Sequence, residues 1–166
     1  MRHVVALVGM VVVLAVGACG SPAAGGVPGK AIKPLPSNVL PATLGDLEVH
    51  PEDVQSTVQQ AANSYASALS LYSLRKTNLV FATLEVARLT DRFNYRNKKQ
   101  QALLADKVGG ARSEPHRVGP VVVYLTTGLR QSISIWFSGR HLFVLSTRED
   151  YDQPRALLRS AIEITP

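Results

Sequence analysis

Hydrophobic positions first follow a helical spacing in the middle of the chain. Between residues 51 and 76 they recur on one face for about five turns, and Pro51, Glu52 and Asp53 are suited to a helix start. Because this face is rich in alanine, we expect the helix to pack closely against a sheet. Its members are Val54, Val58, Ala61, Ala62, Tyr65, Ala68, Leu69 and Tyr72.

Strict alternation replaces the helical spacing at residues 78–89 and predicts a strand there. Both faces of this strand carry apolar residues, which favours a position inside a sheet. The second half of residues 90–108 is interpreted as a helix that ends at Gly109 and Gly110. Residues 44–49 fit either a short edge strand or a connecting loop, and the sequence leaves both open.

Three strands are predicted in close succession over residues 118–125, 131–137 and 140–147. We expect Pro120 at the start of the first strand or at a bulge. Turns are predicted at residues 126–128 and 138–139. The alternation places Ile133, Ile135 and Phe137 on one side of the sheet, together with Leu142 and Val144. A last helix begins at Pro154.

These elements predict an α+β fold: a mainly antiparallel sheet of about four strands with three helices packed on it. The order is helix, strand, helix, three-strand meander, helix. Over residues 44–165 this order resembles the α/β/α sandwich of the PsbP and Mog1 proteins. The resemblance concerns element order alone, so it implies a fold and assigns no functional residue.

A different pattern occupies the first 21 residues. A basic start is followed by an apolar run over residues 4–16, then by Gly17, Ala18 and the chain's single cysteine, Cys19. This pattern is typical of a secretory signal peptide. The run would span roughly 20 Å as a helix, which is short for a hydrocarbon core of about 30 Å. A plain secretory signal and an uncleaved anchor are the alternatives.

Residues 16–19 resemble the lipobox of bacterial lipoproteins. The resemblance implies cleavage before Cys19 and attachment of acyl chains, such as palmitate, to that residue. Two or three chains would hold the protein permanently at a membrane. The expected division is a signal peptide at 1–18, a lipidated tether rich in proline and glycine at 19–43, and one α+β domain at 44–166. With one cysteine, no intramolecular disulfide can form.

Composition adds a basic character and a location. The chain has a net charge of +6 at pH 7, and loss of Arg2 with the signal peptide leaves +5. Arginine outnumbers lysine, and alanine and valine are plentiful, which suits the GC-rich genome of an actinobacterium. We expect a lipid-anchored protein on the extracytoplasmic face of the cell membrane. An exported basic protein favours anionic lipids or cell-wall polymers over nucleic acid.

Two sets of residues are candidates for binding. A basic segment could contact an anionic surface, or it could be an ordinary solvated helix face; it comprises Arg88, Arg92, Arg96, Lys98 and Lys99. An aromatic set is expected on the sheet face opposite Ile133 and Ile135. That set would form an exposed binding patch if no helix covers it and a second core if one does; it comprises Tyr124, Trp136, His141 and Phe143.

The sequence carries no nucleophile-elbow, phosphate-loop or zinc-protease motif. We therefore expect no enzyme activity, no cofactor and no metal. The favoured function is a non-enzymatic binding or scaffold module of the cell envelope, for a partner protein, lipid or cell-wall polymer. The alternative is a carrier or sensor that holds an apolar small molecule between sheet and helix, in a cavity lined by Tyr65, Tyr72 and Phe81.

Overall fold

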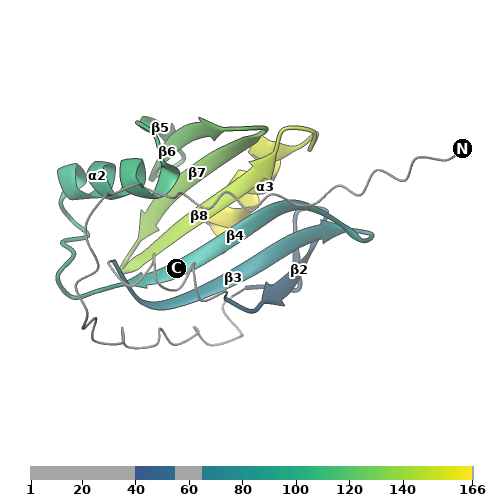
Figure 1. Cartoon of the computed structure of the whole chain (residues 1–166), viewed down its shortest axis with the longest axis horizontal. Helices are drawn as coiled ribbons and strands as arrows, with labels where there is room; N and C mark the ends of the chain where they lie inside the picture. Colours follow the sequence, from purple (N-terminus) through teal and green to yellow (C-terminus); the bar gives the residue numbers. More distant parts are fainter. Residues whose placement is uncertain (1–39, 55–64, 166) are drawn as a thin grey trace, which may run out of the picture.

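The computed structural model describes residues 40–54 and 65–165 of the chain. These residues form one eight-stranded antiparallel sheet in the order β1-β2-β3-β4-β8-β7-β6-β5, with helices α2 and α3 packed on it (Figure 1). The signal peptide, Cys19 and nearly all of the tether lie outside the described residues. The strands are β1 (Thr43–Leu44), β2 (Leu47–Glu52), β3 (Ala66–Lys76), β4 (Leu79–Leu89), β5 (Glu114–Val118), β6 (Val121–Gly128), β7 (Gln131–Ser138) and β8 (His141–Arg148); the helices are α2 (Lys98–Gly109) and α3 (Pro154–Glu163).

The predicted fold class is wrong in its proportions. The sheet has eight strands where about four were expected, and the described residues contain two helices where three were expected. Strand β4 confirms the prediction for residues 78–89 and lies between β3 and β8, inside the sheet. Helix α2 ends as predicted, with Gly110 in the left-handed conformation after it. Helix α3 begins at Pro154 as predicted.

The largest error concerns residues 66–76, which were expected to continue a helix and instead form β3. This strand pairs with β4 over its whole length, from Ala66 opposite Leu89 to Lys76 opposite Leu79. Alanine and leucine favour a helix, so pairing with the strongly strand-like β4 overrides the local preference of this segment. Residues 55–64 of the expected helix lie outside the described residues.

The meander contains one strand more than expected. Residues 114–118 form edge strand β5, which was not predicted, and Gly119 and Pro120 make the turn into β6. Gly119 has φ +58°, which glycine adopts freely in such a turn. Strand β6 continues to Gly128, so the turn predicted at residues 126–128 lies instead at Leu129 and Arg130. Residues 44–49 contribute to the β1–β2 hairpin.

Each face of the sheet has its own hydrophobic core. One core lies between the sheet and α3, and it includes Trp136, Phe143, Leu157 and Ala161. The other lies on the opposite face against α2, and it includes Ile135, Leu142 and Leu104. As expected, Ile133, Ile135, Leu142 and Val144 share this second face. The sheet is therefore a central layer between two cores, with α2 and α3 packed on it (Figure 1).

Candidate functional site

The aromatic set does not form an exposed patch. Trp136 and Phe143 are 0% and 1% exposed and belong to the core beneath α3. A turn at residues 138–139, as predicted, would pair Trp136 with His141. The turn lies instead at Gly139 and Arg140, so Trp136 faces Phe143 across β7 and β8. Tyr124 lies opposite Ile135 and belongs to the other core. For Trp136 and Phe143, the second of the two alternatives therefore holds: they belong to a core that a helix covers.

His141 lies at the margin of this core, at the start of β8. It is partly exposed, and its ring centroid lies 6.2 Å from that of Phe143. Burial, and to a lesser degree the charge of Arg88 on the neighbouring strand, lowers the pKa of His141. The ring is therefore neutral near pH 7 and adds no positive charge to that end of the sheet.

All five residues of the basic segment are exposed, and they lie around one end of the sheet, between the last residues of β4 and the first residues of α2. We call Arg88, Arg92, Arg96, Lys98 and Lys99 the basic margin. The loop that carries Arg92 and Arg96 is well packed: Phe93 stacks on Phe137, and the buried amide of Gln101 donates to the carbonyl of Tyr95 at 2.5 Å. The Asn97 side chain caps α2 by accepting from the backbone N–H groups of the helix start.

The charges of the basic margin are not neutralised within the described part of the chain. All twelve acidic residues of the sequence fall within that part. Among described residues, the nearby Asp91 pairs with Arg140, and no margin side chain forms an ion pair with a carboxylate. Lys98 and Lys99 add to the positive end of the α2 dipole, which carries no acidic residue in its first turn. The margin is a concentrated positive surface.

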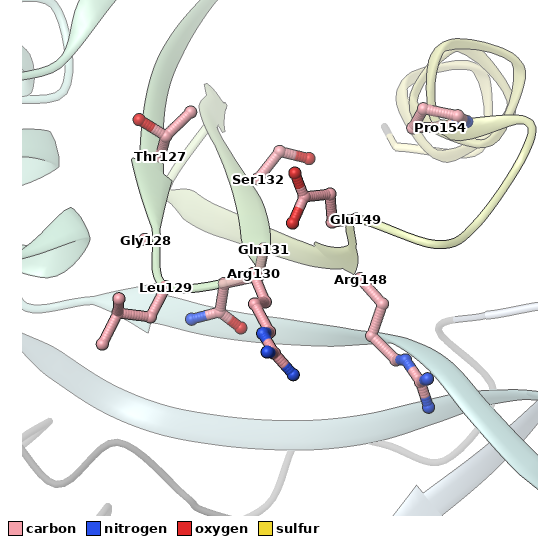
Figure 2. A pocket seen from close by; sticks show the side chains of 9 residues that line it. All are labelled: Thr127, Gly128, Leu129, Arg130, Gln131, Ser132, Arg148, Glu149 and Pro154. Atoms are coloured by element: carbon pink, nitrogen blue, oxygen red, sulfur yellow. The ribbon is translucent and has the colours of Figure 1, made fainter.

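The other end of the same strands carries a groove that no sequence motif predicts. It lies between the β6–β7 hairpin, the end of β8 and the start of α3, and it has a volume of about 400 Å³ (Figure 2). An adjoining hollow of about 350 Å³ shares Arg130, Arg148 and Glu149 with it. We call the two together the hairpin groove. Its further lining residues are Thr127, Gly128, Leu129, Gln131, Ser132, Asp150 and Pro154.

The two arginines of the hairpin groove are held differently. Arg148 donates through Nε and Nη2 to the Asp150 carboxylate, at 2.8 and 2.5 Å, and through Nη1 to the Val80 carbonyl at 3.3 Å. The paired hydrogen bonds from Arg148 lower the pKa of Asp150 and keep that carboxyl ionised. Arg130 has φ +57°, and its carbonyl accepts from the Glu149 N–H at 3.0 Å. Its guanidinium makes no ion pair with a described carboxylate.

A half-buried acid–phenol pair on the α2 face was not predicted from the sequence. The Tyr65 hydroxyl donates to Glu85 Oε1 at 3.0 Å. Burial raises the pKa of Glu85, and the hydrogen bond from Tyr65 opposes that effect. Burial and the neighbouring Glu85 also raise the pKa of Tyr65. Because Glu85 and Tyr65 are twenty residues apart, no local pattern could have paired them.

The residues suggested for a ligand cavity do not gather around one space. Tyr72 belongs to the core beneath α3, whereas Tyr65 packs against the core on the α2 face. Phe81 contacts Tyr151, with ring centroids 5.7 Å apart. Since the sheet separates Tyr65 from Tyr72, no single cavity between the sheet and one helix is lined by both.

Three further observations bear on function. Within residues 40–54 and 65–165, no group of three histidine, cysteine, aspartate or glutamate residues is arranged to hold a metal ion. None of the helices in these ranges is long and apolar enough to span a membrane. No known protein family, curated protein or solved structure matches this chain.

Proposed function

We propose that this protein is a lipoprotein of the bacterial cell envelope, anchored through Cys19, whose domain is a non-enzymatic binding module. The lipobox-like stretch at residues 16–19 supports the anchor. The observation that carries the binding role is the basic margin, with five exposed positive side chains and no carboxylate partner in the described chain. Such a surface attracts anionic groups and is weakened by salt.

The partner of the basic margin in this proposal is the anionic headgroup layer of the membrane that holds the anchor. Twenty residues separate Cys19 from Leu40, the first described residue, and this stretch can span at most about 75 Å. The anchor therefore keeps the domain at high effective concentration beside the headgroups. Each basic residue near such a surface contributes about 1 kcal/mol, so several together favour residence on the membrane.

The anchor is tested on the protein purified from its own membrane. Mass spectrometry of the N-terminal peptide should find Cys19 as the first residue, carrying acyl chains. A Cys19→Ser variant should leave the membrane fraction at high salt. An N-terminus at another residue, or equal membrane retention of the variant, would contradict the anchor.

The basic margin is tested on the non-acylated chain from residue 19 with Cys19→Ser. This protein should sediment with vesicles that contain phosphatidylglycerol and not with pure phosphatidylcholine vesicles. Replacing Arg92, Arg96 and Lys99 by glutamine should weaken vesicle binding about 100-fold, from about 1 kcal/mol for each charge.

A matched control replaces Arg117, Arg155 and Arg159 by glutamine. These three residues are exposed and lie outside the margin, so the control removes the same charge. It should retain most of the binding. Equal losses in both variants would show that net charge, and not the margin, attracts the vesicles. Binding to an anionic wall polymer with no binding to vesicles would assign the margin to a different partner.

A further inference from the structure

We propose that the outward face of α2 inserts into the membrane interface, with Leu103 and Tyr95 as the side chains that enter between the lipid headgroups. This inference rests on the proposed function of the basic margin and adds a hydrophobic contact with the same anionic bilayer. Charges alone would hold the domain near the headgroups. Inserted side chains would also fix which side of the domain faces the lipid.

The exposed apolar side chains of the described chain lie at two kinds of place. Leu103, on α2, is 68% exposed, and Tyr95, three residues before the helix, is 37% exposed. Leu79 and Leu129 are also exposed, and both lie at turns between strands. A single exposed leucine is common on protein surfaces, so its neighbours decide what it indicates.

The neighbours of Leu103 belong to the basic margin. Leu103 follows Lys99 by four residues, so the two side chains share one face of α2, and both are exposed. Leu104 and Ala105 are buried in the core between the helix and the sheet. The solvent-facing side of α2 thus combines a large apolar side chain with positive charge, which is typical of helices that lie in a membrane interface.

Tyr95 is held beside the start of the same helix. Its backbone carbonyl accepts from the side chain of Gln101 in the first turn of α2, and the guanidinium of Arg96 lies 5.7 Å from the centre of its ring. Tyrosine is enriched at the headgroup level of membranes, because its ring is apolar and its hydroxyl is polar. Arginine and lysine can lay their apolar stems along such a surface while their charges reach the phosphates.

Charge selects an anionic bilayer as the partner of this face. Residues 92–110 contain a single carboxylate, Asp106, which accepts from the N–H and hydroxyl groups of Ser113 in the loop after the helix. A second copy of the chain on this face would bring equal positive charges together and would be repelled. Leu129, by contrast, lies in the hairpin groove, where acids such as Glu149 offset the charge of the arginines.

Insertion is tested by the binding of the non-acylated chain from residue 19, with Cys19→Ser, to vesicles that contain phosphatidylglycerol. Leu103→Ala should weaken this binding about fivefold, because it removes apolar surface that the bilayer would cover. Leu129→Ala, the same change at another exposed leucine, should leave the binding unchanged. The salt dependence of binding should be the same in Leu103→Ala as in the wild type, since no charge is lost.

A fluorescent label reports the insertion itself. Because Cys19 is the only cysteine of the sequence, Leu103→Cys in the Cys19→Ser chain offers one thiol for an environment-sensitive dye such as nitrobenzoxadiazole. On the vesicles the emission of the dye should shift to the blue, and lipids with a spin label on the acyl chain should quench it. The dye attached at Leu129→Cys should show neither change.

The outcomes separate this inference from the proposed function. If the wild-type domain does not bind the phosphatidylglycerol vesicles, the membrane role of the basic margin fails, and the insertion fails with it. If the wild-type domain binds and Leu103→Ala binds equally well, the insertion alone is overturned, and the margin acts through charge only. An equal response of the dye at residues 103 and 129 would overturn the insertion in the same way.

Discussion

Trp136 lies nearly parallel to Phe143, with their ring centroids 5.2 Å apart and an angle of 10° between the rings. The two residues face each other on β7 and β8, and both are buried beneath α3. The indole Nε1–H of Trp136 is buried and has no hydrogen-bond partner. An aromatic pair that fills a core thus includes one unsatisfied donor, which reduces what the tryptophan contributes to stability.

Replacing Trp136 should separate its packing from its polar atom. Trp136→Ala removes a large buried side chain and should lower the free energy of unfolding by about 3–5 kcal/mol. Trp136→Phe also removes the unsatisfied N–H, so its loss of packing should be largely offset, within about 1 kcal/mol. Urea denaturation of the two variants measures both values. An equally large loss in Trp136→Phe would mean that the N–H is satisfied in solution.

Glu85 should give the protein an unusual dependence on pH. Its pKa is raised in the folded state by burial, so the folded protein binds the proton more tightly than the unfolded chain. The stabilisation from this proton is present below the unfolded pKa of about 4.5, and it is lost as pH rises through the folded pKa. Glu85→Gln should therefore be more stable than the wild type at pH 7.

The difference between the wild-type and Glu85→Gln stability curves isolates this group. Asp46, Glu52, Asp106 and Asp150 have lowered pKa values, so their stabilisation is lost as pH falls, in both proteins alike. Urea midpoints at several pH values between 4 and 8 give the two curves. A difference that does not change over this range would show that Glu85 is solvated in the folded protein.

A substitution in the turn between β3 and β4 should increase the stability of the protein. Thr77 has φ +59°, an unfavourable conformation for a β-branched residue. Thr77→Gly removes that strain. Glycine also gains entropy in the unfolded chain, which offsets part of the benefit, so we expect a net increase in stability of at most about 1 kcal/mol. The melting temperature should rise by a few degrees. A decrease would mean that the threonine side chain makes a compensating contact.

Two glycines should respond to alanine for different reasons. A Cβ at Gly109 would lie 2.6 Å from Thr126 Cγ2, because α2 ends close against the sheet there. Gly139, at φ +53°, has open space around its Cβ position, so only backbone strain opposes alanine. We expect Gly139→Ala to cost about 1 kcal/mol and Gly109→Ala about 1–3 kcal/mol. Calorimetry of the two variants checks the order.

Two variants of helix α2 test whether the basic margin lowers the stability of the protein. Lys99→Glu places an acid at the positive end of the helix dipole and should stabilise the protein by about 0.3–1 kcal/mol, while weakening binding to anionic vesicles. Lys107→Glu makes the same charge change in the last turn and should be destabilising, with less effect on vesicle binding. Identical behaviour of the two variants would argue against a local role for the margin.

The elements that were predicted correctly have a strong local signal. Strand β4 alternates over its whole length, α2 ends at a glycine pair, and α3 starts at a proline. Strand β3 lacks such a signal. Its serines, alanines and leucines fit the spacing of a helix almost as well as the alternation of a strand, and only the pairing with β4 selects the strand. The extra strand β5 was missed because Pro115 is disfavoured inside a sheet but tolerated at its edge.

The candidate sites divide in the same way. Exposure of the basic margin could be anticipated because charged side chains rarely become buried. The fate of Trp136 depended on whether α3 covers its face, which no local pattern specifies. The hairpin groove arises where the β6–β7 hairpin meets the end of β8 and the start of α3, and it depends on a turn displaced from its predicted position. Sequence alone could not have placed Arg130 beside Arg148.

Pro51 and Pro115 lie on strands near the two borders of the sheet, β2 and β5. Proline has no N–H to offer to an approaching strand, so sheet extension from one molecule into the next is hindered at both borders. If many copies share one membrane, their collision frequency is far higher than in solution. Under such crowding these two prolines would help each domain remain a separate monomer and resist joining its neighbours into fibrils.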